Sequence, residues 1–342
     1  MRAAVLIAPG KPLEIWDVVL PEPGLGQVRV RLRRSGICGS QLLEVSGSRG
    51  EDAYLPHLLG HEGSGTVISV GAGVTKVRPG DRVIISWMTG VGLDAGGLRL
   101  TAGTRTVNAG PVATLAEEAI VPENRLVPIP DGVPLPDAAL VGCALATGCG
   151  IVRNTLQLRA GQSIAVFGAG GIGINVVQMA RYSGAGPIIA IDVDQKKLAW
   201  AKEFGATEVI DARREDVLGA IYAFSGGGVD AAVATAGSRS SMELALAAVK
   251  RGGTAVIAGN LAAGERVSID PFDLIKGKRL IGTWGGENNP DSDFPFYLDL
   301  VRQGALRLKE LASHSFPLEA VNEALAALRA GNALRAVVDL AP

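Results

Sequence analysis

Residues 163–192 decide the fold: S-I-A-V-F-G-A-G-G-I-G-I-N-V-V-Q-M-A-R-Y-S-G-A-G-P-I-I-A-I-D. The apolar run at 164–167 is typical of a buried parallel strand. A glycine-rich segment follows it, and apolar residues of helix length then continue to Tyr182. A second apolar run ends on Asp192. This order predicts a strand, a tight turn, a helix and a second parallel strand.

The glycines have the spacing that a dinucleotide needs. Gly168 permits a tight turn out of the strand, Gly170 lets the backbone approach a pyrophosphate, and Gly173 lets the helix pack close to the strand. The helix that starts near Gly171 offers free N–H groups and a partial positive charge to phosphates. A lone G-x-G-x-x-G is weak evidence, but the strand, the helix and the terminal acid around this one predict a Rossmann site.

The acid that ends the second strand favours NAD over NADP. Asp192 follows Gly173 by 19 residues, where a carboxylate can accept hydrogen bonds from the ribose hydroxyls. Asp192 and Asp194 would repel a 2′-phosphate, and no arginine lies beside them in the sequence. Lys196 and Lys197 follow on the next turn, so the exclusion of NADP is not absolute; Lys197 is counted with the cofactor-binding residues.

The composition indicates an ordinary globular protein of two domains. The chain has 342 residues, of which 47% are hydrophobic and 20% charged. Its net charge of −1 argues against nucleic acid and anionic membranes as partners. Three cysteines are few and odd in number, which favours a reducing compartment, and we expect the cytoplasm. The start of the chain is typical of a first strand rather than a signal peptide.

Two kinds of pattern divide the chain. Residues 1–90 are β-rich, and after residue 164 strands and helices alternate, which predicts a doubly wound parallel sheet and an α/β fold. Residues 91–110 are expected to form a glycine-rich loop, and 137–150 a helix. The expected strands are 27–32, 66–70, 82–85, 188–191, 208–210, 231–234, 254–258, 279–283 and 335–340; the expected helices are 172–182, 196–204, 214–224, 241–250, 294–303 and 318–330.

Three side chains of metal-ligand type stand out in the first half. They are Cys38 in S-G-I-C-G-S, His61 in L-L-G-H-E-G-S-G and Cys143 in V-G-C-A-L-A-T-G. Two thiolates and one imidazole leave one position of a tetrahedral zinc open, as in catalytic sites. The separations of 23 and 82 residues carry little weight alone, and each cysteine by itself is more often a buried apolar residue.

Together, G-I-C-G-S, G-H-E-G-S-G, G-C-x-x-x-T-G, G-A-G-G-I-G and the late L-R-A-V-V resemble the zinc-dependent medium-chain alcohol dehydrogenases. The resemblance covers essentially the whole chain. It implies a GroES-like β-rich catalytic domain at 1–145 and 288–342, with a Rossmann NAD-binding domain at 146–287. It also implies a homodimer or homotetramer that pairs through the last Rossmann strand, which ends at Trp284.

The resemblance assigns roles to individual residues. The catalytic zinc would be held by Cys38, His61 and Cys143, with Glu62 behind it as an occasional ligand. Ser40 would take the substrate proton while hydride passes between an alcohol and NAD. The remaining cofactor contacts would come from Thr147 and Ile172 at the nicotinamide, Gly168, Gly170, Gly171 and Gly173 at the phosphates, Asp192 at the ribose, and Arg335 at the pyrophosphate.

The chain also departs from that family. Many relatives bind a second, structural zinc with four cysteines, but residues 91–110 contain none, so we expect one zinc per chain and a loop held by packing alone. Gln41 stands where an acid often orients the zinc-binding histidine, and Leu43 stands where a histidine often ends the proton relay. His57 is a candidate substitute in that relay, although a loop residue is the simpler interpretation.

The sequence therefore predicts a zinc-dependent oxidoreductase that transfers hydride between an alcohol, aldehyde or ketone and NAD(H). A sugar or polyol dehydrogenase of the same family is the first alternative. A zinc-free quinone or enone reductase is disfavoured by the intact ligand set. A non-catalytic or regulatory NAD-binding protein is the alternative from another class. The run G-T-W-G-G-E followed by D-S-D-F-P resembles, loosely, branches that act on thiol-adduct or aryl alcohols.

Overall fold

The chain forms two units in the computed structural model, which describes residues 1–340. The first unit contains Met1–Cys143, Asn289–Gln303 and the described residues from Leu308 onward. The second contains Ala144–Asn288 and Gly304–Arg307. The first unit is thus assembled from three separate stretches of sequence, whereas the second is nearly continuous.

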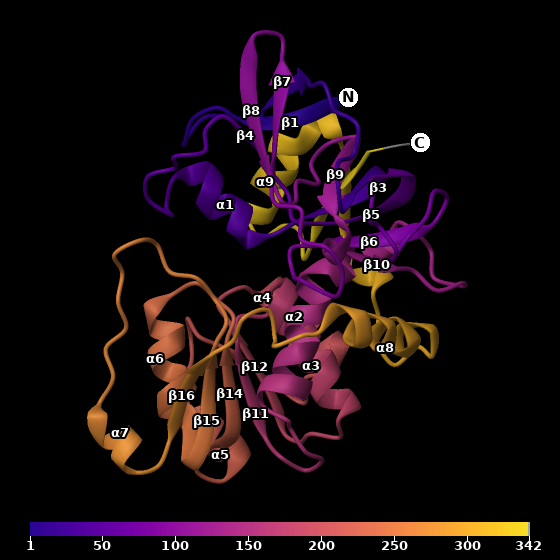
Figure 1. Ribbon diagram of the computed structural model, residues 1–342. Helices are drawn as coiled ribbons and strands as arrows, with labels where there is room; N and C mark the ends of the chain where they lie inside the picture. The colour runs from indigo at the N-terminus through magenta and orange to yellow at the C-terminus, as the bar shows by residue number, and fades with distance from the viewer. Residues whose placement is uncertain (341–342) are drawn as a thin grey trace. The chain divides into compact units, whose positions relative to one another are not determined.

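Two β-sheets build the first unit. One has the order β2-β1-β4-β8-β7 and the other the order β10-β6-β5-β3-β18-β17, with β9 also against β3. Strand β18 runs antiparallel to β3 with Ala336 opposite Ile37, so the end of the chain rejoins its beginning, as expected (Figure 1). The strands are β1 (Arg2–Leu6), β2 (Glu14–Asp17), β3 (Gln27–Ile37), β4 (His57–Leu58), β5 (Glu62–Val70), β6 (Arg82–Ser86), β7 (Leu98–Ala102), β8 (Arg105–Gly110), β9 (Glu118–Pro122), β10 (Leu126–Pro128), β17 (His314–Pro317) and β18 (Ala336–Asp339).

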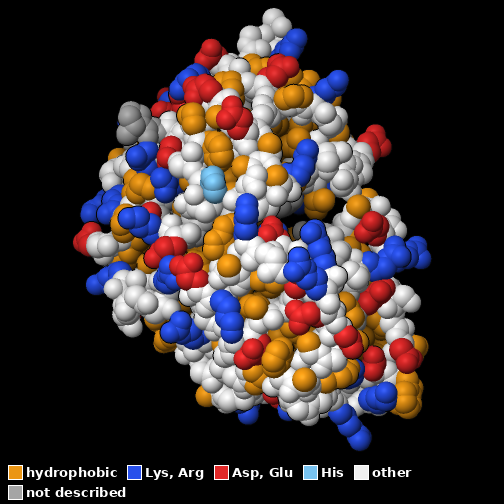
Figure 2. Space-filling view, turned by 180° about the vertical axis from the view of Figure 1, so that it is seen from behind, with side chains coloured by type: hydrophobic (Ala, Val, Ile, Leu, Met, Phe, Trp, Pro, Cys, Tyr) orange, Lys and Arg blue, Asp and Glu red, His pale blue; other side chains and the backbone are white. Residues whose placement is uncertain are grey.

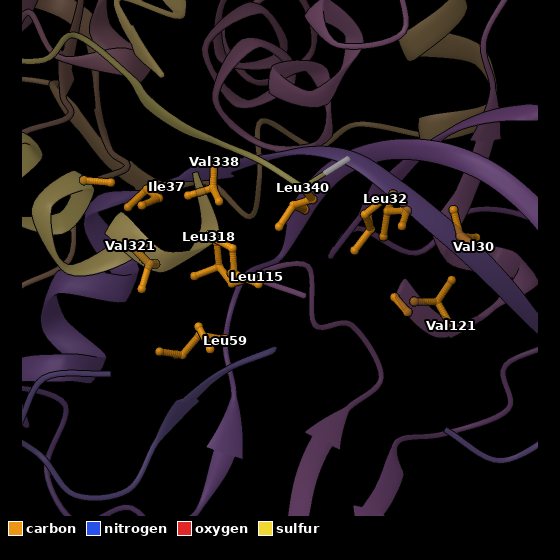
Figure 3. Packing of buried hydrophobic residues seen from close by; sticks show 14 of the residues in the cluster. Val30, Leu32, Ile37, Leu59, Leu115, Val121, Leu318, Val321, Val338 and Leu340 are labelled. Atoms are coloured by element: carbon orange, nitrogen blue, oxygen red, sulfur yellow. The ribbon is translucent and has the colours of Figure 1, made fainter. Parts of the chain in front are cut away.

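A core of aliphatic side chains fills this unit. Figure 3 shows Leu32 and Ile37 of β3 together with Leu115, Val321 and Val338, which come from distant parts of the sequence. Burial of such side chains is the main favourable contribution to folding. The α-helices of the unit are α1 (Gly39–Ser46), α8 (Pro290–Arg302) and α9 (Val321–Arg329), and its short 3₁₀ segments are 123–125, 137–142, 309–311 and 318–320.

The second unit is a six-stranded parallel sheet with helices between its strands. Its order is β13-β12-β11-β14-β15-β16, which confirms the doubly wound α/β class that the sequence predicts. The strands are β11 (Ile164–Phe167), β12 (Ile188–Asp192), β13 (Glu208–Asp211), β14 (Val229–Ala234), β15 (Val249–Ile257) and β16 (Arg279–Gly282). The helices are α2 (Ala144–Gly150), α3 (Gly171–Tyr182), α4 (Gln195–Phe204), α5 (Val217–Ser225), α6 (Arg239–Ala248) and α7 (Pro271–Ile275), with a π-helical turn at Ile151–Thr155.

Three sequence predictions were wrong in detail. The expected loop at 91–110 contains the hairpin β7–β8, whose turn is made by Gly103 and Thr104. The expected helix at 137–150 is interrupted at Cys143, where a 3₁₀ segment stops and α2 begins. The expected helix at 241–250 ends at Ala248, because Val249 already pairs with Val229 in the sheet.

The surface carries both signs of charge. On the face seen in Figure 2, basic and acidic side chains are interspersed, as the net charge of −1 leads one to expect. Among residues 1–340, the helices are all too short or too polar to cross a bilayer.

Candidate functional site

Three element boundaries of the first unit bring Cys38, His61 and Cys143 together. Cys38 follows β3 and is the extended N-cap residue of α1. His61 immediately precedes β5, and Cys143 follows the 3₁₀ segment at 137–142. The potential ligand atoms of these three side chains all lie within 4.8 Å of one another. The structure therefore gathers three residues that are separated by 23 and 82 positions in the sequence.

This donor set fits zinc. A tetrahedral zinc has Zn–S bonds of about 2.3 Å, so its ligand atoms lie roughly 3.5–3.8 Å apart, which the cluster accommodates. A hydrogen bond from Cys143 lowers the pKa of the Cys38 thiol well below its ordinary value. Burial opposes this shift, but His61 and the positive charge of Arg335 add to it. The site thus favours the thiolate, which is the form that binds metal.

Gln41 holds both Cys38 and His61. Its side-chain oxygen accepts a hydrogen bond from the backbone N–H of Cys38 over 2.7 Å, and its Nε2 lies 2.7 Å from Nδ1 of His61. Gln41 is 1% exposed, so the amide is fixed by its surroundings. The expectation that Gln41 can orient the imidazole without adding a negative charge agrees with this contact.

A buried ion pair lies next to the cluster. The Glu62 carboxylate, which is fully buried, pairs with the Arg335 guanidinium, which is 3% exposed. The carboxylate lies over Gly36, where a Cβ atom would approach Glu62 Oε1 to 2.6 Å. The sequence did not predict this pairing, because 273 residues separate the partners. The role expected for Arg335 at the pyrophosphate stays a prediction.

Ser40 and His57, the remaining polar residues near the cluster, differ in whether their side chains are already hydrogen-bonded. The Ser40 hydroxyl is buried and makes no hydrogen bond within residues 1–340. The two ring nitrogens of His57 both face oxygen atoms, since Nε2 lies 2.8 Å from the Asp52 carboxylate and Nδ1 lies 2.8 Å from the Leu58 carbonyl. His57 lies in strand β4 rather than in a loop, and the contacts of both ring nitrogens favour a structural role over a role in the proton relay.

The glycine-rich turn of the second unit has the geometry that its sequence predicts. Gly168 has a φ of +104°, which favours glycine, and a Cβ at Gly173 would lie 1.9 Å from the Gly168 carbonyl oxygen. Gly170 is the N-cap of α3, and a Cβ there would meet no atom within 4 Å. The first turn of α3, which starts at Gly171, has no side-chain cap, so its N–H groups are available to an anion.

Other predicted cofactor residues lie in the same unit. Asp192 ends β12, and its two carboxylate oxygens accept hydrogen bonds from the N–H groups of Ala169 (2.8 Å) and Asp194 (3.0 Å). Lys197 is on α4, and Ile172 is in the first turn of α3. Thr147 is on α2, which packs closely on α3. Cys149 is fully buried, and burial raises the pKa of its thiol, as expected for a packing residue.

Sequence reasoning missed a polar clamp around residues 91–93. The Glu123 carboxylate accepts hydrogen bonds from the N–H groups of Thr75, Lys76 and Leu93, and Asp291 accepts one from Val91 over 2.5 Å. The expectation that packing alone holds this loop is therefore wrong. The sequence did not predict these contacts, because Glu123 is 30 positions from Leu93 and Asp291 is 200 positions from Val91.

Sequence reasoning also missed a cavity of about 670 Å³ that adjoins the metal-ligand cluster. Its lining includes Gln41 and His61 as well as residues 49–54. All of its lining residues belong to the first unit.

Comparisons with known proteins agree with this geometry. A model of the alcohol dehydrogenase GroES-like domain matches residues 24–131, and a model of the zinc-binding dehydrogenase family matches residues 171–303. An S-(hydroxymethyl)glutathione dehydrogenase from Escherichia coli O1:K1 is 33% identical over 98% of this chain and 99% of its own length.

Solved structures show the same similarity. An alcohol dehydrogenase zinc-binding domain protein from Burkholderia ambifaria is 29% identical with a TM-score of 0.91, covering 100% of this chain and 99% of its own. Benzyl alcohol dehydrogenase from Acinetobacter calcoaceticus is 26% identical with a TM-score of 0.89, covering 99% of each chain. Taken with the motifs and the convergent cluster, these matches establish that the chain belongs to the zinc-dependent medium-chain alcohol dehydrogenase family and is an alcohol oxidoreductase.

Proposed function

We propose that the protein interconverts an alcohol and the corresponding aldehyde or ketone, with NAD(H) as the hydride acceptor or donor. One catalytic zinc would be held by Cys38, His61 and Cys143. The observation that carries the proposal is the convergence of these three ligands beside the unpartnered hydroxyl of Ser40. When bound, zinc supplies a Lewis acid that lowers the pKa of a hydroxyl group, and NAD supplies the hydride acceptor.

The chain's own residues then move the proton and hold the charge. Ser40 is next to Gly39 at the start of α1, two residues from Cys38, and its free oxygen is placed to accept the proton of the substrate hydroxyl. Gln41 keeps His61 oriented. Glu62 would stand behind a zinc held by the three ligands, and the Arg335 guanidinium balances its charge in the buried environment.

The second unit is proposed to bind the dinucleotide. The uncapped start of α3 receives the pyrophosphate, Asp192 and Lys197 contact the adenosine ribose, and Thr147 and Ile172 flank the nicotinamide. Asp192 supports NAD over NADP. Arg335 still has a buried Nε without a hydrogen-bond partner within the described chain, which supports its assignment to the cofactor phosphates as well. Catalysis is assigned to residues 1–145 and 288–342, and cofactor binding to 146–287.

We further propose that the chain holds a single zinc. Residues 91–110 lack the cysteines of a structural site, and the Glu123 and Asp291 contacts anchor the loop instead. The three cysteines form no disulfide bond within residues 1–340, which supports a reducing cytoplasmic location.

The substrate is proposed to be an aryl or thiol-adduct primary alcohol. The names of two relatives, an S-(hydroxymethyl)glutathione dehydrogenase and a benzyl alcohol dehydrogenase, support these two classes. Polyols are the alternative within the family, and a non-catalytic NAD-binding protein is the alternative outside it.

A homodimer or dimer of dimers is proposed to form at the free edge of the parallel sheet. Strand β16 ends that sheet, with Ile281 37% and Trp284 78% exposed. Phe272, Leu274 and Ile275 of the preceding helix are also exposed apolar side chains. An unpaired strand edge with apolar neighbours is suited to pairing with a second copy.

NADH formation by the zinc-loaded protein tests the proposal, with benzylic, short primary, secondary, polyol and thiol-adduct alcohols as substrates. The variants Cys38→Ser and Cys143→Ser are expected to lose zinc, measured by elemental analysis, and to lose at least about 100-fold in kcat/KM. Cys149→Ser is the matched control and should keep both, because Cys149 packs in the other unit. Full zinc loss without loss of turnover would contradict the assignment.

A further inference from the structure

The cavity beside His61 has apolar walls and a charged rim. Leu58 and Leu59 are 6% and 3% exposed, and Pro111 and Val112 line the cavity with them. The rim is formed by residues 49–54. A volume of about 670 Å³ lies within the range of small-molecule sites, so the cavity is large enough for an aromatic ring with a substituent.

Most charges on the rim neutralise one another. Arg49 pairs with Glu44 over 2.6 Å, and the Asp52 carboxylate faces His57 over 2.8 Å. Each of these carboxylates therefore already has a basic partner on the protein.

Glu51 differs from the other acids of the cavity. Its side chain is exposed, and the carboxylate forms no ion pair or hydrogen bond with residues 1–340. Tyr54, three residues further on, is 71% exposed and also lines the cavity. A carboxylate and an aromatic ring that line one cavity can both attract an organic ammonium group, the carboxylate through its charge and the ring through its face. An anionic group at the same place would meet like charge.

We propose that this cavity binds the end of the substrate that is remote from the reacting hydroxyl, and that Glu51 and Tyr54 select alcohols whose remote end carries an ammonium group. The proposal rests on the proposed alcohol dehydrogenase function, because it places the reacting hydroxyl at the cluster that includes His61. It names the substrate class as a cationic, ring-sized primary alcohol and makes anionic alcohols the disfavoured class.

Three benzyl alcohols of similar size test the selection: 4-(aminomethyl)benzyl alcohol, unsubstituted benzyl alcohol and 4-(hydroxymethyl)benzoate. With zinc-loaded protein and NAD at low salt, we expect kcat/KM for the ammonium compound to exceed that for the carboxylate by about tenfold. The ratio should shrink toward one at about 0.5 M salt, because the rim is exposed to solvent.

Variants of Glu51 separate charge from shape. Glu51→Gln should reduce the tenfold ratio to less than about threefold, and Glu51→Lys should invert it in favour of the carboxylate. Glu22→Gln removes an exposed charge outside the cavity and should leave the ratio unchanged. Only a folded and active Glu51→Lys protein can invert the kcat/KM ratio, so this result cannot be mistaken for a loss of folding or of activity.

The two proposals fail in different ways. Turnover of benzyl alcohol with no preference for the ammonium compound, or with a ratio that Glu51→Lys does not change, would overturn the cavity proposal and leave the alcohol dehydrogenase function intact. No turnover of any compound would count against the proposed function. In that case, calorimetric Kd values of the ammonium and carboxylate compounds still decide the cavity proposal, and equal values overturn it.

Discussion

Ser40 has a buried hydroxyl that satisfies no other group of the described chain. An orphaned buried hydroxyl costs stability, and it is tolerated where a ligand supplies the missing partner. Ser40→Ala is therefore expected to lower kcat by about 10²- to 10³-fold while zinc content stays at the wild-type level. Ser40→Thr, which keeps the hydroxyl, is the control and should retain most of the rate. A Ser40→Ala protein with a wild-type pH–rate profile and rate would remove Ser40 from the proton path.

At the residue scale, the sequence could predict the metal ligands because cysteine and histidine are rare in this chain. The chain has three cysteines and three histidines, so the ligand candidates were few, and the motifs around them selected Cys38, His61 and Cys143. The Glu62–Arg335 pair could not be predicted from the residues alone, because glutamates and arginines are common and nothing local links positions 273 apart. The contact of Gln41 with His61 could be predicted from the resemblance, because Gln41 stands where an acid often orients the zinc-binding histidine.

The glycines of the turn between β11 and α3 have different roles, and substitutions by alanine can distinguish a role in stability from a role in NAD binding. Gly173→Ala places a Cβ 1.9 Å from the Gly168 carbonyl oxygen, so it should destabilise the second unit and lower its thermal midpoint. Gly170→Ala meets nothing within 4 Å, so stability should be unchanged, while the NAD Kd, measured by calorimetry, rises about tenfold or more because the Cβ obstructs the phosphates. Tight NAD binding by Gly170→Ala would contradict the assigned approach.

The clamp at Glu123 is a second element-scale prediction. Burial raises the pKa of Glu123, but hydrogen bonds from Leu93, Thr75 and Lys76 outweigh it and hold the pKa below its ordinary value of 4.5. The stabilising contribution is thus fully present above pH 4.5 and is lost as the pH falls through the lowered pKa. Glu123→Gln should cost about 1–3 kcal/mol in urea unfolding of the first unit at pH 7.

The same comparison has an internal control. The cost of Glu123→Gln should diminish as the pH falls below 4.5 and through the lowered pKa of Glu123, because the wild-type carboxyl then becomes protonated. Glu22→Gln, which alters an exposed side chain, should have little effect over the same pH range. A cost that is independent of pH would show that the charge of Glu123 does not anchor the loop.

Regular hydrophobic patterns explain which elements were predicted. The strands of the second unit and its helices α3 to α6 were placed within a few residues, since each buried strand is a continuous apolar run, whereas the short helix α7 was not predicted. The hairpin β7–β8 was missed because Gly92, Gly96, Gly97 and Gly103 favoured a loop over the alternation in L-R-L-T-A and R-T-V-N-A. The break at Cys143 was missed because the small, mildly apolar residues on both sides of it favour one continuous helix.

At the scale of the whole molecule, the free edge of the parallel sheet makes a prediction about assembly. Ile281→Lys places a charge on β16 and should shift the protein from dimer to monomer in sedimentation velocity. NAD binding should survive, because the glycine-rich turn follows a different strand of the sheet. Val19→Lys, which alters an exposed apolar residue of the other unit, is the control. A dimer that persists in Ile281→Lys would place the interface elsewhere.

The pairing of β18 with β3 has a consequence for biosynthesis. During translation, the sheet of the first unit lacks a strand until residues 336–339 leave the ribosome, whereas the strands of the second unit are all complete after residue 282. Buried Glu62 likewise waits for Arg335 to be made. The nascent chain is therefore expected to complete its parallel sheet first, while its N-terminal segment is still incompletely folded. At that stage the unpaired edge of β3 is exposed, and binding by chaperones would prevent its aggregation.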